Sequence, residues 1–203
     1  MPRVPTLVLV TDRLATGGRD LVDVVAAALD AGLPAVQLRE KDLPGRQLLA
    51  LAERLRTVTT RAGALLLVND RVDVAAAAGA DGVHLGGGSV PVDVARALLP
   101  AGALVGVSTH AAAEAAATTA DFAVFGPVYA TPSKAAYGPP QGEERFRAAA
   151  ATARVPLLAI GGVTASHVPV LRAAGASGVA VIRAILAAVD PAAATRALLS
   201  ALG

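Results

Sequence analysis

At Ala31-Gly32-Leu33-Pro34-Ala35-Val36 a helical stretch ends on a glycine and an apolar strand begins. The same arrangement returns at Ala78-Gly79-Ala80-Asp81-Gly82-Val83 and at Ala174-Gly175-Ala176-Ser177-Gly178-Val179. In each copy the glycine stands where a left-handed backbone closes a helix, a conformation that glycine adopts without steric cost. The repeat therefore predicts a fold built from helix-to-strand units.

Short apolar runs alternate with helical stretches over the rest of the chain. The predicted strands are residues 6–10, 35–38, 65–68, 82–85, 104–107, 122–125, 157–160 and 178–182. The spacing of apolar residues predicts helices that include residues 21–29, 46–60, 92–99, 111–117 and 167–174. Strands that are apolar on both faces suit a parallel sheet, and uninterrupted strand–helix units favour a closed barrel. We therefore predict an α/β fold, a single (βα)8 TIM barrel over residues 1–203.

An open, doubly wound nucleotide-binding sheet is the alternative architecture. It would carry a glycine-rich phosphate loop after its first strand. Thr11-Asp12-Arg13 stands there instead. In a barrel the active residues follow the carboxyl ends of the strands.

Composition excludes several classes of protein. Of 203 residues, 54% are hydrophobic and 17% charged, which excludes intrinsic disorder. The net charge of +2, the absence of a basic run and an aromatic content of 2% give no sign of a nucleic-acid partner. The chain has no cysteine, so disulfides, thiolate metal sites and cysteine nucleophiles are excluded.

Export and membrane insertion are not expected either. Prolines and glycines interrupt the longest uncharged stretches, and the N-terminus lacks the apolar segment of a signal peptide. We expect a cytoplasmic protein with no membrane partner, and the sequence leaves a homo-oligomer open.

Nearly all of the basic residues are arginine. Of 18 basic residues only two, Lys41 and Lys134, are lysine. Arg39 and Lys41 end the second predicted strand two residues apart, a spacing that points both side chains the same way in extended chain. A phosphate-rich ligand is their natural counterpart. The alternative is a solvated loop with a salt bridge among Arg39, Glu40 and Lys41.

Further polar residues follow the other predicted strands. Asp70 beside Asn69 suits Mg²⁺, although either residue could instead cap the next helix. His84 lies within a strand, where an interior hydrogen-bonded histidine is commoner than a catalyst. Ser108 could donate to a phosphate or cap a helix, and no Ser-His-Asp set makes it a nucleophile.

Two segments complete the predicted site. The loop of residues 125–140 carries Lys134, and we interpret it as a lid that brings this lysine over an anionic ligand, the alternative being a solvated connection. Gly161-Gly162, together with the eighth strand, lies where barrels bind phosphate through backbone N–H groups, unless these are simply tight turns.

Taken together, these motifs resemble the thiamine phosphate synthase and thiazole tautomerase (TenI) superfamily from Asp12 to Ile185. In family order they are VQLREK at residues 36–41, VNDR at 68–71, GVHLG at 82–86, GVSTH at 106–110, FGPVYATPSK at 125–134, AIGGV at 159–163 and GVAVIRAI at 178–185. The resemblance implies a barrel enzyme that joins 4-amino-5-hydroxymethyl-2-methylpyrimidine diphosphate to a thiazole phosphate. Thiamine phosphate and pyrophosphate would be the products.

The resemblance also implies roles for single residues. The residues that would hold the pyrophosphate are Arg39, Lys41, Asn69, Ser108 and Lys134, of which all but Asn69 are assigned as catalytic. Asp70 would bind Mg²⁺. The other substrate-binding residues would be Gln37 at the pyrimidine, His84, and, around the thiazole phosphate, Thr131, Ser133, Gly162, Val181 and Ile182.

Two positions depart from the synthase pattern. Ser89 stands where synthases carry a second metal-binding aspartate, and Arg183 stands where they commonly carry a serine. The tautomerase branch also tends to lack that aspartate, but this chain has Pro127 as synthases do. We expect a synthase, with a metal-independent tautomerase or a non-catalytic thiamine-phosphate binder as alternatives.

Overall fold

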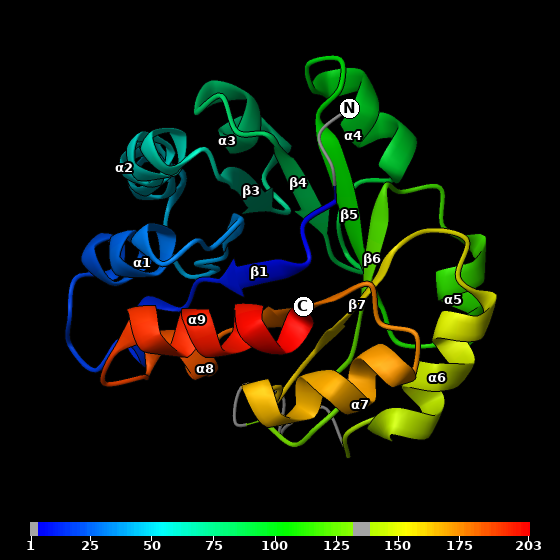
Figure 1. The fold of residues 1–203 in the computed structure, drawn as a ribbon. Helices are drawn as coiled ribbons and strands as arrows, with labels where there is room; N and C mark the ends of the chain where they lie inside the picture. The colour runs from blue at the N-terminus through cyan, green and yellow to red at the C-terminus, as the bar shows by residue number, and fades with distance from the viewer. Residues whose placement is uncertain (1–3, 132–138) are drawn as a thin grey trace.

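The computed structural model describes residues 4–131 and 139–203, whose strands close into one parallel barrel in sequence order (Figure 1). The strands are β1 (Leu7–Val10), β2 (Ala35–Leu38), β3 (Leu65–Asn69), β4 (Gly82–Leu85), β5 (Leu104–Thr109), β6 (Phe122–Phe125), β7 (Leu157–Ile160) and β8 (Gly178–Val181). The predicted TIM barrel is confirmed. Strands β3 and β5 run one and two residues further than predicted, so that Asn69 and Ser108 lie inside strands.

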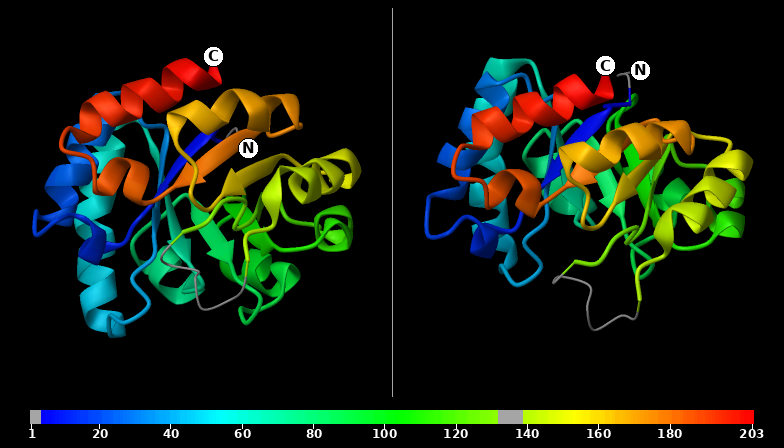
Figure 2. Two further views of the ribbon diagram at one scale, coloured as in Figure 1. Left: turned by 90° about the horizontal axis from the view of Figure 1, so that it is seen from below. Right: turned by 60° about the horizontal axis from the view of Figure 1, so that its bottom comes forward.

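Helices surround the strands on the outside (Figure 2). They are α1 (Leu21–Asp30), α2 (Gly45–Ala62), α3 (Val72–Ala77), α4 (Val92–Leu98), α5 (Ala112–Ala117), α6 (Gly142–Thr152), α7 (Val168–Ala173), α8 (Arg183–Leu186) and α9 (Pro191–Leu202), with short 3-10 turns η1 (Arg13–Ala15) and η3 (Ala165–His167). Helix α9 packs against α1, α7 and α8. None of the helices in the described part of the chain combines the length and the apolar character that crossing a bilayer requires.

The repeated glycine marks helix ends as predicted. Gly32, Gly79 and Gly175 have φ angles of 96°, 61° and 99°. In each copy the glycine N–H and the N–H of the next residue donate back to the last helical turn, as in Leu33 N to Ala28 O at 3.1 Å. These two backbone hydrogen bonds satisfy carbonyl groups that a helix end otherwise leaves without partners.

Small side chains let the barrel close around a filled interior. Phe122 is 1% exposed and its ring occupies the space beside Gly106, where a Cβ atom would lie 2.2 Å from the ring. The other buried residues of this inner cluster are Val8, Val10, Ala35, Leu67, Leu104, Val124, Leu158 and Ala180. The interior is thus a packed core.

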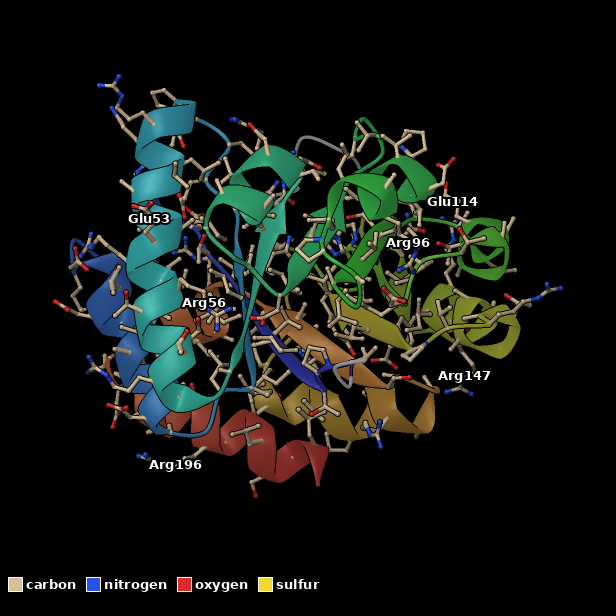
Figure 3. All side chains as sticks on the ribbon, turned by 90° about the horizontal axis from the view of Figure 1, so that it is seen from above. Glu53, Arg56, Arg96, Glu114, Arg147 and Arg196 are labelled. Atoms are coloured by element: carbon tan, nitrogen blue, oxygen red, sulfur yellow. The ribbon has the colours of Figure 1, made fainter. Side chains whose placement is uncertain are left out.

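Two similar ion pairs support the entry ends of the strands. Asp81, just before β4, accepts from Leu66 N at 2.7 Å and pairs with Arg56 at 2.6 Å. Asp121, just before β6, likewise accepts from Val105 N at 2.7 Å and pairs at 2.8 Å with Arg96, whose side chain is labelled in Figure 3. Each aspartate joins two neighbouring strands to a helix. Both lie at the amino ends of the strands, the face of a barrel whose residues contribute to stability.

Candidate functional site

A cavity of about 310 Å³ lies at the carboxyl ends of the strands. It is lined by eleven of the predicted site residues, which are Gln37, Arg39, Lys41, Asn69, Asp70, His84, Ser108, Thr131, Gly162, Val181 and Ile182. Ser133 and Lys134 lie outside the described residues. His110, at the end of the GVSTH motif, and Arg183 also line it.

The two basic residues that follow β2, Arg39 and Lys41, line the cavity, whereas the acidic residue between them is bound elsewhere. Glu40 is 5% exposed and accepts from the Arg13 backbone N–H at 3.0 Å and from the Arg13 guanidinium at 3.0 Å. Arg13 also pairs with Asp42 at 2.5 Å. Within residues 4–131 and 139–203, neither Arg39 nor Lys41 forms a salt bridge, so the alternative of a local ion-paired loop is wrong.

Asp70 sits at the centre of a hydrogen-bonded group. Its Oδ1 accepts from Gly86 N at 3.0 Å and from the Ser89 hydroxyl, and its Oδ2 accepts from Asn69 Nδ2 at 2.6 Å. Asn69 Oδ1 in turn accepts from Gln37 Nε2 at 3.2 Å. The φ angle of Asp70 is 60°, a left-handed conformation that costs energy in a residue other than glycine. Asp70 lines the cavity, and the alternative that Asn69 or Asp70 caps α3 is wrong, since α3 has no side-chain cap.

The surroundings of Asp70 keep it charged. Burial would raise the pKa of the Asp70 carboxyl, but hydrogen bonds from Ser89, Gly86 and Asn69 and the charge of Lys41 outweigh burial and lower the pKa. Asp70 is thus an anion among cations and amides. Among the described residues there is no group of three histidine, aspartate or glutamate side chains that could hold a metal by itself.

His84 and Ser108 meet on neighbouring strands. The distance from His84 Nε2 to Ser108 Oγ is 2.9 Å. Burial lowers the pKa of His84 to about 4, so its ring is neutral at pH 7. His84 Nδ1 is buried and has no hydrogen-bond partner among the described residues, which means that no carboxylate completes a catalytic triad. Ser108 does not cap α5, whose first turn has no side-chain cap, so that alternative is wrong.

The Gly161-Gly162 turn after β7 has no room for a side chain. Both glycines have positive φ angles, 96° and 64°. A Cβ on Gly161 would lie 2.5 Å from Pro127 Cβ, and one on Gly162 would lie 2.5 Å from Ala130 O. The backbone of this turn therefore borders the cavity directly, an arrangement that suits contact with an anion through N–H groups.

One aromatic contact beside this turn was not predicted. Tyr129 stacks on His167 with ring centroids 4.0 Å apart and donates to Glu143 Oε1 at 2.8 Å. Thr164, which lines the cavity, was also missed. The residues come from the loop after β6, from η3 and the residue before it, and from α6, and they are far apart in the sequence, so that no local pattern indicates their contact.

Comparison with known proteins gives one consistent result. A family model described as thiamine monophosphate synthase matches residues 7–185. A Geobacter sulfurreducens protein, provisionally named thiamine-phosphate synthase, is 55% identical over 200 residues, covering 97% of this chain and 94% of that protein. Thiamine-phosphate synthase of Methanoculleus marisnigri is 48% identical, covering 95% and 92%. The structure of thiamine phosphate pyrophosphorylase from Pyrococcus furiosus matches with a TM-score of 0.86 at 34% identity, covering 97% of this chain and 95% of that one.

Proposed function

The chain belongs to the thiamine monophosphate synthase family and has the function of a thiamine-phosphate synthase, a transferase that releases pyrophosphate, and from this premise we propose how its cavity works. The substrates are 4-amino-5-hydroxymethyl-2-methylpyrimidine diphosphate and a thiazole phosphate. Both bind in the cavity at the carboxyl ends of the strands. One observation carries the proposal, namely that Arg39 and Lys41 line the cavity while Glu40 is held by Arg13.

The diphosphate binds at the ends of β2, β3 and β5. Arg39 and Lys41 supply positive charge, and Asn69 and Ser108 supply neutral donors. Lys134, which lies outside the described residues, joins them by the family resemblance. Since Gln37 Nε2 donates to Asn69, the Gln37 carbonyl oxygen is left to accept from the amino group of the pyrimidine, beside the ring of His84.

The Asp70 carboxylate could bind one Mg²⁺ ion only together with oxygen atoms of the diphosphate. Asp70 Oδ1 accepts two hydrogen bonds and Oδ2 one, which leaves Oδ2 with room for a cation. One carboxylate with phosphate oxygens and waters is a common magnesium site. When bound, the ion would neutralise charge on the departing diphosphate. Ser89, in place of a second carboxylate, holds Asp70 by donating to it.

The thiazole phosphate binds at the ends of β7 and β8. Gly162, Val181 and Ile182 line the cavity there, and their backbone N–H groups bind its phosphate. Thr131 and Ser133 line the thiazole pocket, Ser133 by the family resemblance alone.

Charge neutralisation is the main task of the protein in this reaction. The bond between the pyrimidine methylene carbon and the diphosphate oxygen breaks, and pyrophosphate leaves with the electron pair. The thiazole nitrogen lone pair then forms the new C–N bond to the methylene carbon. The electron-rich pyrimidine stabilises the cation formed between these events, so that the cations at β2 act where negative charge grows.

The test compares charge removal inside and outside the cavity. Purified protein is given both substrates and Mg²⁺, and thiamine phosphate and pyrophosphate are measured. We expect Arg39→Met and Lys41→Met each to lower kcat/KM for the pyrimidine diphosphate by about 100-fold. Arg196→Met is the control, because Arg196 is exposed on α9 and points away from the barrel (Figure 3), and it should stay within about twofold. Unchanged rates in both cavity variants would refute the proposed diphosphate site.

A further inference from the structure

The ring of His84 is held inside the barrel and has one hydrogen-bond partner among the described residues. It is 3% exposed and packs against Phe122, with ring centroids 5.9 Å apart. Its Nε2 lies 2.9 Å from Ser108 Oγ, while Nδ1 is buried without a partner in the described part of the chain. A buried polar atom without a partner is rare in folded proteins and calls for an explanation.

The neutral ring has two tautomers, and they leave Ser108 in different states. If the hydrogen is on Nδ1, Nε2 accepts the Ser108 hydroxyl hydrogen, and the serine offers only lone pairs to the cavity. If the hydrogen is on Nε2, the ring donates to Ser108 Oγ, and the hydroxyl hydrogen is free to point into the cavity. An anionic ligand needs the second arrangement, because lone pairs repel it.

We propose that His84 is a positioning residue, whose Nε2–H donates to Ser108 Oγ and so directs the Ser108 hydroxyl hydrogen at the diphosphate. This inference rests on the contact between Ser108 and the diphosphate proposed above. The partnerless Nδ1 then carries a lone pair and no hydrogen. A donor that bonds to a hydroxyl oxygen also strengthens the bond which that hydroxyl donates.

The strands fix the two side chains relative to each other. His84 pairs with Gly106 in the register of β4 and β5, and Ser108 is two residues further along the same strand face. Gly106 has no side chain, and this gives room to the Phe122 ring that backs His84. Ser108 can therefore be oriented by the barrel before any ligand arrives, which is what stabilisation of developing charge requires.

The first experiment reads the tautomer directly in the wild-type protein. Ring ¹⁵N shifts and two-bond couplings are recorded by NMR with and without inorganic pyrophosphate and MgCl₂. The chain has three histidines, so His110→Gln and His167→Gln variants assign the signals. We expect His84 to carry its hydrogen on Nε2 in the pyrophosphate-bound protein. A hydrogen on Nδ1 would overturn the proposal.

The second experiment separates positioning from packing by steady-state kinetics. Gln is long enough to place an amide N–H near the position of Nε2, whereas Asn is too short to reach Ser108. We expect Ser108→Ala to lower kcat by about 100-fold or more, His84→Asn by at least about 10-fold, and His84→Gln to recover most of that loss, with KM for the thiazole phosphate unchanged. The double variant His84→Asn with Ser108→Ala should be no slower than Ser108→Ala alone.

Two outcomes would contradict the inference, and they can be told apart. If the two losses multiply in the double variant, His84 does not act through Ser108, and this inference falls while the diphosphate site stands. If Ser108→Ala keeps its full kcat and its KM for the pyrimidine diphosphate, the proposed contact of Ser108 falls and takes the inference with it. Should His84→Asn fail to fold, the wild-type NMR result decides.

Discussion

Replacing Gly162 by alanine should damage both the fold and the proposed thiazole phosphate site. The φ angle of 64° is unfavourable for alanine, and the added Cβ would lie 2.5 Å from Ala130 O and 2.8 Å from Tyr129 Cβ. The left-handed conformation costs about 1–2 kcal/mol in a residue other than glycine. Overpacking adds about 1–3 kcal/mol. We therefore expect Gly162→Ala to lower the free energy of unfolding by about 3 kcal/mol.

Two matched glycines separate these costs. Gly102 has a φ angle of 88° with nothing within 4 Å of a built Cβ, so Gly102→Ala carries the conformational cost alone, about 1 kcal/mol once the loss of unfolded-chain entropy is counted. Gly88 has neither a positive φ angle nor a neighbour within 4 Å, so Gly88→Ala should change stability by less than about 0.5 kcal/mol. Equilibrium urea unfolding of the three variants measures the series.

The same variants test the site. Gly162→Ala should raise KM for the thiazole phosphate much more than KM for the pyrimidine diphosphate, since only the former binds at β7 and β8 in our proposal. If Gly162→Ala unfolds at the same urea concentration as Gly102→Ala, the crowding at Ala130 and Tyr129 has no energetic weight and the reasoning fails.

Three further predictions address metal binding, the eighth strand and acid stability. Ser89→Asp adds a carboxylate beside Asp70, and calorimetric titration should show Mg²⁺ binding about tenfold tighter without substrate, whereas the uncharged Ser89→Asn should show no gain. Arg183→Ser removes a cation that lines the cavity, and kinetics should show KM for the thiazole phosphate raised about tenfold with KM for the pyrimidine diphosphate unchanged; the reverse pattern would place Arg183 at the diphosphate. Because the pKa of His84 is about 4 when folded against 6.5 when unfolded, the unfolded chain binds the proton first as pH falls. Urea unfolding should therefore show about 2 kcal/mol of stability lost between pH 7 and pH 5, and His84→Gln, which keeps His110 and His167, should lose correspondingly less.

The barrel could be predicted because its signals are local. The glycines that end the helices at Gly32, Gly79 and Gly175 each stand next to the residues they affect, and the apolar strands are short continuous runs. Helix α6 was not predicted, and the structure gives a reason. Of its eleven residues, only Phe146 and Ala149 are buried, so its sequence lacks a continuous apolar stripe.

The sequence was enough to predict which residues line the candidate site, but not which of them contact one another. Strand ends identify Asp70 and Ser108 because a parallel barrel gathers all such ends at one rim. The hydrogen-bond partners of these residues could not be predicted, because Ser89 bonds to Asp70 across 19 positions in the sequence and His84 bonds to Ser108 across 24. Such contacts depend on strand register and on the left-handed backbone of Asp70. Neither can be derived from the amino-acid composition or from the spacing of apolar residues.

The placement of Glu40 explains how a segment with both charges can still present a cationic surface. In an extended chain, the alternation of side chains sends Arg39 and Lys41 to one face and Glu40 to the other. Glu40 is nearly fully buried there, which would be costly for a charge without partners, and Arg13 supplies both a backbone N–H and a guanidinium. The pairing thus stabilises the first loop against the second, and it also holds the carboxylate between the two cations away from the cavity. Breaking it would leave a buried carboxylate to compete for Arg39 and Lys41, so the ion pair at Arg13 preserves the positive charge on which the proposed diphosphate binding depends.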